Sequence, residues 1–404
     1  MKTFTFHMLA GLLVASLVFG ANVAHAQAGS LDKTFGKRGT VTANLGITAT
    51  TLTAIEQSDG DIAVVTGLNK TGFPGTEAFA LIRYTSSGVL LSTTTASFFT
   101  NGNSIPIAAA VQSDGDIVVA GTTSGTGPAT EFALARFLPT GQLDTTFGQG
   151  GLVTTVPTGV FPSVSALLVQ SNGQILVAGS AGSGLRKVPS PTILVRYNSN
   201  GSLDTTFGEG GIVEEPTLIL APTALAQLSD GSYLAVGGAS SEEFSSTGVL
   251  QSIVTPETIV ASNPSSPASE AIVSQPNGDF VEAAVVGNGF QKTAGELFRF
   301  GETAVLDSTF SSTKFTFGGQ KQNQPAAIAL QSNGQIVVGG DSGLARFDSN
   351  GILDTAFGTG GSLATTFGIS GVLIQTDGKI IAIGNQVNTE TGITTLTVAR
   401  YLGN

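Results

Sequence analysis

The chain has 404 residues, of which only 11% are charged, and its mean hydropathy is +0.28. Disordered chains combine low hydrophobicity with high charge, so this composition excludes a disordered protein. The net charge of −11 opposes binding to nucleic acid, and the absence of cysteine excludes disulfides and thiol chemistry.

The first 26 residues have the pattern of a bacterial Sec-type signal peptide. Lys2 supplies the positive start, the stretch from Met8 to Val18 is apolar, and Ala24-His25-Ala26 is a small-x-small cleavage site. The apolar stretch is shorter than the ~20 residues that a spanning helix needs. We therefore expect cleavage after Ala26, one mature domain over 27–404, and a secreted or periplasmic monomer without stable membrane insertion.

Loss of this leader removes both histidines and both methionines, so the mature sequence has no His, Met, Cys or Trp. Because Lys2 is lost as well, the net charge moves from −11 to −12. Ser-His-Asp and Cys-His catalysis and His/Cys zinc sites are thereby excluded. We expect no cofactor and no metal, and carboxylates are the remaining groups for chemistry.

A short apolar–turn–apolar string recurs seven times along the mature chain. It begins as Gln57-Ser58-Asp59-Gly60-Asp61-Ile62, and its turn glycines are Gly60, Gly115, Gly173, Gly231, Gly278, Gly334 and Gly378. Repeats of this length are typical of propellers, solenoids and arrays. The Asn/Asp-Gly pairs predict a hairpin between the first two strands of each repeat, with a two-residue type I′ turn.

Each repeat continues with two further predicted strands. The third strand ends in an Arg-aromatic pair, as at Arg136-Phe137, which only the fourth copy lacks. A Gly-x-Leu-Asp-x-x-Phe-Gly-x-x-Gly connection then leads to a fourth strand, clearest at 141–151, 201–211 and 351–361. Four short antiparallel strands per repeat make a propeller blade. The sequence predicts an all-β, seven-bladed β-propeller of four-stranded antiparallel blades.

The two ends of the mature chain complement each other. The last Arg-aromatic pair is Arg400-Tyr401, so the connection that should follow is missing at the C-terminus. That connection stands at the N-terminus instead, from Gly29 through Leu31-Asp32 to Phe35-Gly36. We expect residues 29–44 to form the outer strand of the last blade and so close the ring without an exposed sheet edge.

The segment Ala-Arg-Phe-x-x-x-Gly-x-Leu-Asp-x-x-Phe-Gly-x-Gly-Gly at 135–151 resembles the bacterial delta-60 repeat. The hairpin and the Val-Ala-Gly that follows it at 170–179 are similar to the same repeat. The resemblance covers nearly all of 27–404 and implies a β-propeller of exported or surface proteins, distantly similar to the NHL-type propellers. It implies no activity. The departure is blade four, at 239–262, whose outer strands it leaves in doubt.

The recurring polar residues have structural interpretations. We expect the recurring aspartates to cap turns, the arginines to pair with a carboxylate or loop carbonyls, and the phenylalanines to wedge between blades. Asp59-Gly60-Asp61 and Asp114-Gly115-Asp116 look like calcium loops, but the hairpin turn accounts for them, and the distal glutamate of a full loop is missing.

Function is expected where the repeats differ, in the connections between strands two and three and between successive blades. Both kinds lie on one face of an up-and-down propeller, and loops on a rigid scaffold commonly carry binding residues. The candidate ligand-binding residues on this face are Lys70, Phe73, Phe161, Arg186, Lys187, Glu242, Glu243, Phe290, Lys292 and Lys321.

We therefore expect an exported, non-catalytic binding or scaffold propeller whose partner is an extracellular protein segment or a glycan. The alternative is an enzyme, a carboxylate-dependent glycoside hydrolase or polysaccharide lyase, because paired acids can cleave glycosides without histidine. Against it, the recurring acids are expected to serve turns.

Overall fold

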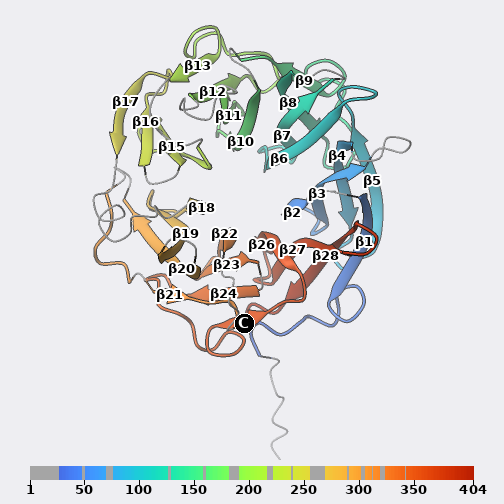
Figure 1. Ribbon diagram of the computed structural model, residues 1–404, viewed down its shortest axis with the longest axis vertical. Coiled ribbons are helices and arrows are strands. Elements are labelled where there is room, and N and C mark those ends of the chain that lie inside the picture. Colours follow the sequence, from blue (N-terminus) through green and yellow to red (C-terminus); the bar gives the residue numbers. More distant parts are fainter. Residues whose placement is uncertain are drawn as a thin grey trace, which may run out of the picture.

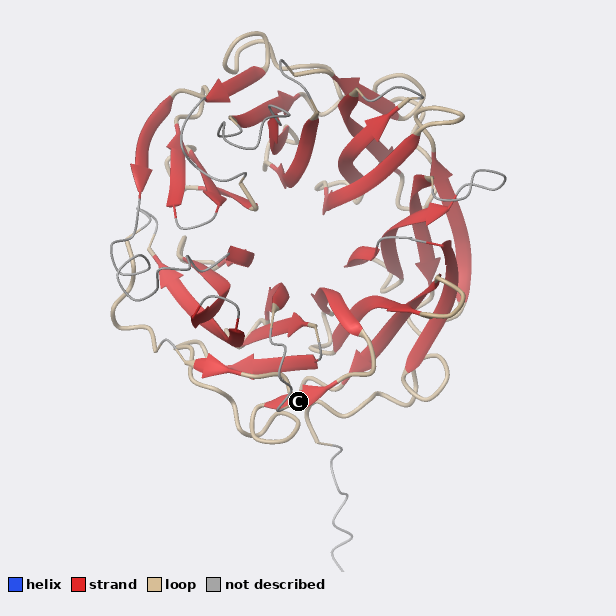
Figure 2. Ribbon diagram, viewed as in Figure 1, coloured by secondary structure: helices blue, strands red, loops and turns tan. Residues whose placement is uncertain are grey.

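The computed structural model describes residues 27–47, 51–69, 76–125, 129–157, 161–181, 191–215, 222–237, 240–254, 269–288, 291–301, 305–311, 313–318, 324–341 and 343–404. Seven four-stranded antiparallel sheets surround a central axis (Figure 1). These residues form strands and loops, and no helix occurs among them (Figure 2). The predicted seven-bladed β-propeller is confirmed. The predicted signal peptide lies outside the described residues.

The blades follow the chain, with the first strand of each innermost. Blade 1 consists of β2 (Thr51–Glu56), β3 (Ile62–Asn69), β4 (Glu77–Tyr84) and β5 (Leu90–Ala96), and blade 2 of β6 (Asn103–Val111), β7 (Ile117–Ser124), β8 (Thr130–Phe137) and β9 (Leu152–Thr155). Blade 3 consists of β10 (Pro162–Val169), β11 (Ile175–Ala181), β12 (Thr192–Tyr197) and β13 (Ile212–Glu215), and blade 4 of β14 (Ala224–Gln227), β15 (Tyr233–Gly237), β16 (Ser240–Phe244) and β17 (Leu250–Val254). Blade 5 consists of β18 (Ser269–Ser274), β19 (Phe280–Asn288), β20 (Gln291–Phe300) and β21 (Lys314–Phe315), and blade 6 of β22 (Pro325–Leu330), β23 (Ile336–Gly340), β24 (Gly343–Phe347) and β25 (Ser362–Ala364). Blade 7 consists of β26 (Gly368–Ile374), β27 (Ile380–Val387), β28 (Ile393–Tyr401) and β1 (Thr40–Ile47).

The core lies between the blades rather than within one central cluster. The middle strands are buried on both faces, as in β12, where all six residues are buried. Val118 and Phe132 of blade 2 share one apolar cluster with Val177 and Val195 of blade 3. Since each blade covers both of its neighbours, strands that are apolar on both faces suit this ring, which explains the positive mean hydropathy.

The hairpin turns differ from the predicted type I′ geometry. In blade 1 the Gly60 N–H donates to the Gln57 carbonyl, and the Gln57 N–H donates to the Asp61 carbonyl. Gly60 has φ +83°, whereas Asp59 is not among the described non-glycine residues with positive φ. This is a three-residue loop, a type I turn followed by a left-handed glycine, rather than a two-residue turn. Both turns need a glycine, so Asp-Gly alone does not distinguish them.

The ring closes within blade 7, as predicted. β1 pairs with β28 from Thr40 opposite Ala399 to Ile47 opposite Ile393. Upstream of β1, the Asp32 N–H donates to the Arg400 carbonyl at 2.8 Å. In this connection Phe35 is fully buried, whereas Leu31 is 39% exposed.

Blade 4 is complete despite its divergent sequence. β14 to β17 form a four-stranded sheet in which Leu234 pairs with Glu243 and Tyr233 with Phe244. Glu243-Phe244 therefore occupy the register of the Arg-aromatic pairs, because Leu176 pairs with Arg196 in blade 3. The doubt about its outer strands is resolved. What the blade lacks is the arginine.

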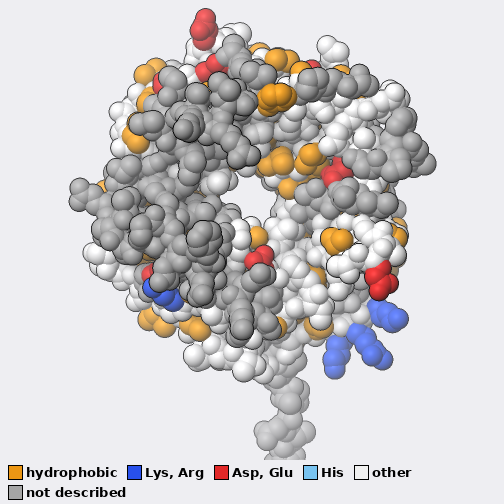
Figure 3. All heavy atoms as spheres, in the orientation of Figure 1, with side chains coloured by type: hydrophobic (Ala, Val, Ile, Leu, Met, Phe, Trp, Pro, Cys, Tyr) orange, Lys and Arg blue, Asp and Glu red, His pale blue; other side chains and the backbone are white. Residues whose placement is uncertain are grey.

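The antiparallel order gives the ring two different faces. The face that carries the hairpin turns and the connections to the outer strands, such as 57–61 and 85–89, is called the turn face. The opposite face, which carries connections such as 97–102 and 388–392, is called the loop face. A hole passes through the centre of the molecule (Figure 3).

Candidate functional site

Six of the ten candidate binding residues lie outside the described residues. They are Lys70, Phe73, Arg186, Lys187, Phe290 and Lys321. The structure places the remaining four, and it brings none of them together in a described pocket.

Three of these four stand on strands, so their assignment to loops was wrong. Glu242 and Glu243 lie within β16, and Glu242 is fully buried. The Glu243 carboxylate accepts a hydrogen bond from the Ser252 hydroxyl at 2.8 Å. Lys292 lies within β20, where it pairs with Gly287. Hydrogen-bonded ladders continue through these positions, and in β20 the ladder continues even through Gly295.

Phe161 is the fourth and lies on the loop face as predicted. It directly precedes Pro162, the first residue of β10, and its side chain is 43% exposed. Its φ is +60°, a left-handed conformation that is a strained choice for a bulky residue. The Thr130 hydroxyl donates to the Pro162 carbonyl at 2.8 Å and anchors the next residue to blade 2. The scaffold thus holds Phe161 in an unfavourable backbone conformation, with its aromatic ring directed outward.

The turn face carries a repeated unit of arginine, aspartate and phenylalanine. In blade 3 the Arg196 guanidinium contacts the Asp204 carboxylate at 2.7 Å and lies 4.5 Å from the ring centre of Phe207. Asp204 also accepts hydrogen bonds from the hydroxyl and N–H of Thr206. The same unit recurs as Arg136-Asp144-Phe147, Arg299-Asp307-Phe310, Arg346-Asp354-Phe357 and Arg400-Asp32-Phe35. The predictions of turn-capping aspartates, paired arginines and buried phenylalanines are confirmed.

Each of the six arginines near the end of a third strand also reaches the following blade. Its guanidinium donates to a backbone carbonyl in the next turn: Arg83 to Thr140, Arg136 to Ser199, Arg196 to Ser246, Arg299 to Ser349, Arg346 to Gly403 and Arg400 to Ser86. Blade 4 has Glu243 in this position and cannot make the link. The arginines therefore form a structural ring that holds adjacent blades together, and their charges are not available to a ligand.

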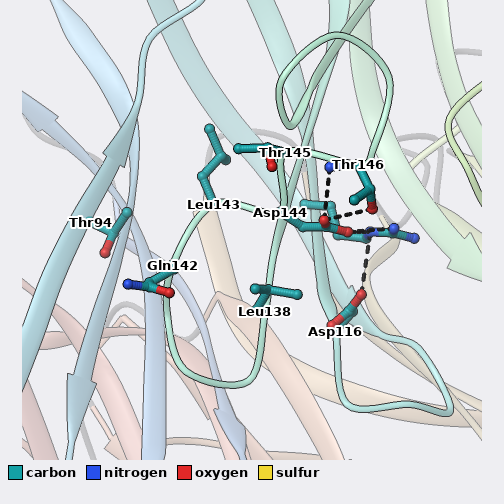
Figure 4. A pocket seen from close by; sticks show the side chains of 9 residues that line it. Thr94, Asp116, Leu138, Gln142, Leu143, Asp144, Thr145 and Thr146 are labelled. Carbon is teal, nitrogen blue, oxygen red and sulfur yellow. Dashed lines mark hydrogen bonds and ion pairs between the residues drawn. The ribbon is translucent and has the colours of Figure 1, made fainter.

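Blade 2 departs from this structural pattern. An open pocket of about 830 Å³ lies on the turn face beside blade 1, and its lining includes Thr94, Asp116, Arg136 and Asp144. Asp116 and Asp144 approach one guanidinium from two sides (Figure 4), at 3.4 Å and 2.5 Å. In blade 3 the residue equivalent to Asp116 is Gln174, which donates a hydrogen bond to the aspartate instead.

The two carboxyls of this pocket have pKa values displaced in opposite directions. Burial, the largest cause, raises the pKa of Asp116, and the charges of Asp114 and Asp144 raise it further against the lowering effect of Arg136. Burial also raises the pKa of Asp144, but hydrogen bonds from Thr146 and Arg136 outweigh it and hold that pKa below its ordinary value. Such a pair can supply one acid and one base. An alignment of the repeats, in which Asp116 of blade 2 stands opposite Gln174 of blade 3, could have revealed this pair of acids from the sequence.

The calcium-like turns are occupied by their own contacts. Asp59 accepts a hydrogen bond from the Asp61 N–H at 3.0 Å, and Asp61 pairs with Arg83 at 3.1 Å. Within the described ranges, no three or more acidic residues are placed to hold a metal ion.

The chain matches a family described as "Domain of unknown function (DUF5122) beta-propeller" over residues 112–147, 170–207 and 331–357. These stretches cover hairpins and arginine–aspartate units of blades 2, 3 and 6, so the match supports a propeller family. No curated protein matches the chain. The described part of the chain has no helix with the length and hydropathy needed to cross a bilayer.

Several solved structures are similar to the chain at low identity. A Bacteroides caccae protein of unknown function is 15% identical, with a TM-score of 0.42 over 70% of this chain and 93% of its own. The extracellular domain of a putative one component system from B. thetaiotaomicron is 14% identical, with a TM-score of 0.45 over 88% of this chain and 39% of its own. A Penicillium chrysogenum alpha-L-arabinanase is 14% identical, with a TM-score of 0.45 over 89% of this chain and 98% of its own.

Proposed function

We propose that the chain is an exported binding or scaffold propeller, of the delta-60 type, whose monomeric ring presents its loop face to an extracellular protein segment or a glycan. Residues 1–26 are the signal peptide that exports it. The observation that carries the proposal is Phe161, a 43% exposed aromatic side chain with φ +60°. Strained residues persist where the surrounding structure holds them, and they cluster at binding sites.

The chemistry of Phe161 is suited to both partner classes. An aromatic ring offers a flat apolar face that can pack on a sugar ring or on a peptide side chain. Among the described residues it is the only aromatic side chain with large exposure, since the other exposed large hydrophobic residues are aliphatic.

The test is a screen of residues 27–404 on a glycan array and in pull-downs from the surrounding medium. The matched variants are Phe161→Ala on the loop face and Val249→Ala, an apolar residue on the turn face that is 64% exposed. We expect loss of the captured ligand with Phe161→Ala alone. Binding that survives Phe161→Ala, or that fails with Val249→Ala, would move the site away from the loop face.

The alternative function is carboxylate-based cleavage of a polysaccharide. It is supported by Asp116 and Asp144, two acids with opposite pKa displacements in one pocket. Against it, Asp144 makes the same contacts with its arginine and threonine as Asp204 makes in blade 3, where Gln174 stands in place of the second carboxylate. Turnover of a polysaccharide that is lost in Asp116→Asn and Asp144→Asn, and kept in Asp61→Asn, would establish the enzyme.

A further inference from the structure

The loop that closes the ring carries an exposed basic cluster that the other repeats lack. Lys33, Lys37 and Arg38 are all exposed, and no ion pair joins them to another described side chain. The six blade arginines are paired or bound to carbonyls, so among the described residues this loop gathers three exposed cations without an ion pair, whereas Lys314 is exposed elsewhere on its own. At the matching positions blade 2 has Thr145, Gln149 and Gly150; blade 3 has Thr205, Glu209 and Gly210; blade 6 has Thr355, Thr359 and Gly360.

Arg38 shows that the cluster is not required by the fold. Its φ is +58°, and the matching glycines Gly150, Gly210 and Gly360 have φ between +63° and +65°. A left-handed backbone costs free energy for any residue with a Cβ, and the other repeats avoid that cost. A Cβ added at each of these glycines would meet no atom within 4 Å, so the position faces open space. The arginine therefore stands in a strained backbone conformation with an exposed side chain.

The neighbouring strand β5 has an open edge. It is the last strand of its sheet, and it forms six pairs with β4; among the other outer strands β9 and β13 have four residues, β25 has three and β1 has eight. No charged residue or proline lies between Thr85 and Ile105. Natural edges are usually protected by charge, proline, short length or a β-bulge, and β5 has only a bulge, where its pairing with β4 shifts register between Leu90 and Ser92.

Exposed aliphatic side chains lie where this edge begins. Val89, Leu90 and Leu91 are 61%, 58% and 47% exposed. The basic loop touches this point, because the Gly36 N–H donates to the Ser87 carbonyl at 2.8 Å. In Figure 3 basic side chains gather at the lower right of the rim, where Figure 1 shows the blue loop that leads into β1, and another basic side chain lies at the lower left. The edge, the aliphatic residues and the cations thus form one continuous surface, called the blade 1 edge.

We propose that the blade 1 edge binds an extended peptide segment of another protein, which adds a fifth strand to blade 1 through backbone hydrogen bonds. Alternate side chains of the peptide pack on Leu90 and Leu91, and acidic residues at its end pair with Lys33, Lys37 and Arg38. This is strand addition, in which the backbone gives affinity and the side chains give specificity. The cations select an acidic partner and speed the encounter.

Charge decides against the other two occupants. A second copy of this chain would bring its own β5, which has no acidic residue to meet the cations. An anionic membrane would attract three cations but would repel the rest of a chain with net charge −11. The acidic peptide alone matches both the cluster and the open edge.

The experiment measures binding of a fluorescent peptide of alternating valine and threonine with glutamates at both ends. The comparison peptide carries lysines at both ends. The triple variant Lys33→Thr, Lys37→Gln and Arg38→Gly substitutes the blade 2 residues, so it is expected to fold. It should weaken Kd for the acidic peptide about tenfold. Leu91→Lys should also weaken binding although it adds positive charge, because it protects the edge.

Hydrogen exchange separates strand addition from simple charge attraction. Bound acidic peptide should slow exchange of backbone N–H groups in Leu90–Ala96, and Phe161→Ala should leave this effect unchanged. Four outcomes would overturn the proposal: equal binding of both peptides, no slowing in β5, undiminished binding by Leu91→Lys, or capture by anionic phosphatidylglycerol vesicles that the acidic peptide fails to displace.

Discussion

Removal of residues 27–47 should open the ring, because these residues supply the outer strand and the wedge of the closing blade. The deletion removes Phe35, which is fully buried, and Leu45, which is 1% exposed. Burial of such side chains contributes about 1.5–3 kcal/mol each. The deletion also removes Asp32, whose carboxylate pairs with the Arg400 guanidinium at 2.9 Å, and so leaves that guanidinium without its carboxylate partner. Breaking a buried pair costs about 3–5 kcal/mol.

These losses come to about 6–11 kcal/mol, comparable with the roughly 5–15 kcal/mol that stabilises a whole domain. The truncated chain should therefore melt far below residues 27–404 in calorimetry, or aggregate through the bared edge of β28. The control is a circular permutant that begins at Thr51 and carries 27–47 after Asn404, since the Gly29 N–H already meets the Leu402 carbonyl at 2.7 Å. An equally stable, monomeric truncation, or an unfolded permutant, would refute this closure.

Three smaller changes test local features. Gly173→Val should cost about 1–3 kcal/mol in a denaturant titration through backbone strain alone, because an added Cβ meets only Ser199, at 3.4 Å; an unchanged midpoint would contradict the left-handed turn. Asp116→Gln should stabilise the protein by about 1 kcal/mol at pH 7, by analogy with Gln174. Because the folded pKa of Asp116 lies above its unfolded value, the gain should disappear as the pH falls below that unfolded pKa, near 3.8; a gain that persists in acid would contradict the raised pKa. Arg38→Gly should raise the free energy of unfolding by about 1 kcal/mol in the same titration, and a loss would show that Arg38 makes a stabilising contact.

The architecture could be predicted because the same pattern of strands and turns recurs in each repeat. Seven turn glycines, the Arg-aromatic strand ends and the split repeat at the termini all point to one closed ring. Details that depend on hydrogen-bond register could not be predicted. Gly60 serves a type I turn with a left-handed glycine as readily as a type I′ turn. Ala28 precedes the repeat motif, yet it is buried and its carbonyl accepts a hydrogen bond from the Gly358 N–H of blade 6.

The candidate site was harder to predict than the fold. The sequence places Glu242 and Glu243 in a loop because blade 4 lacks the arginine that marks the third strand elsewhere. The pairing of arginines with following blades is a long-range contact that a local pattern does not contain. Phe161 is unusual in the sequence as an aromatic residue in a variable connection, but its backbone strain and its exposure are visible only in three dimensions.

The most direct test of the proposed function is hydrogen exchange on residues 27–404 with and without the ligand selected by the array or pull-down. A loop-face site predicts slower exchange in the segment from Thr155 to Val164 around Phe161, with no change in the turns at 57–61 and 112–116. The same experiment on Phe161→Ala should show no slowing at all. Slowing confined to the turn face, around Asp116 and Asp144, would contradict the loop-face site and favour the carboxylate pocket.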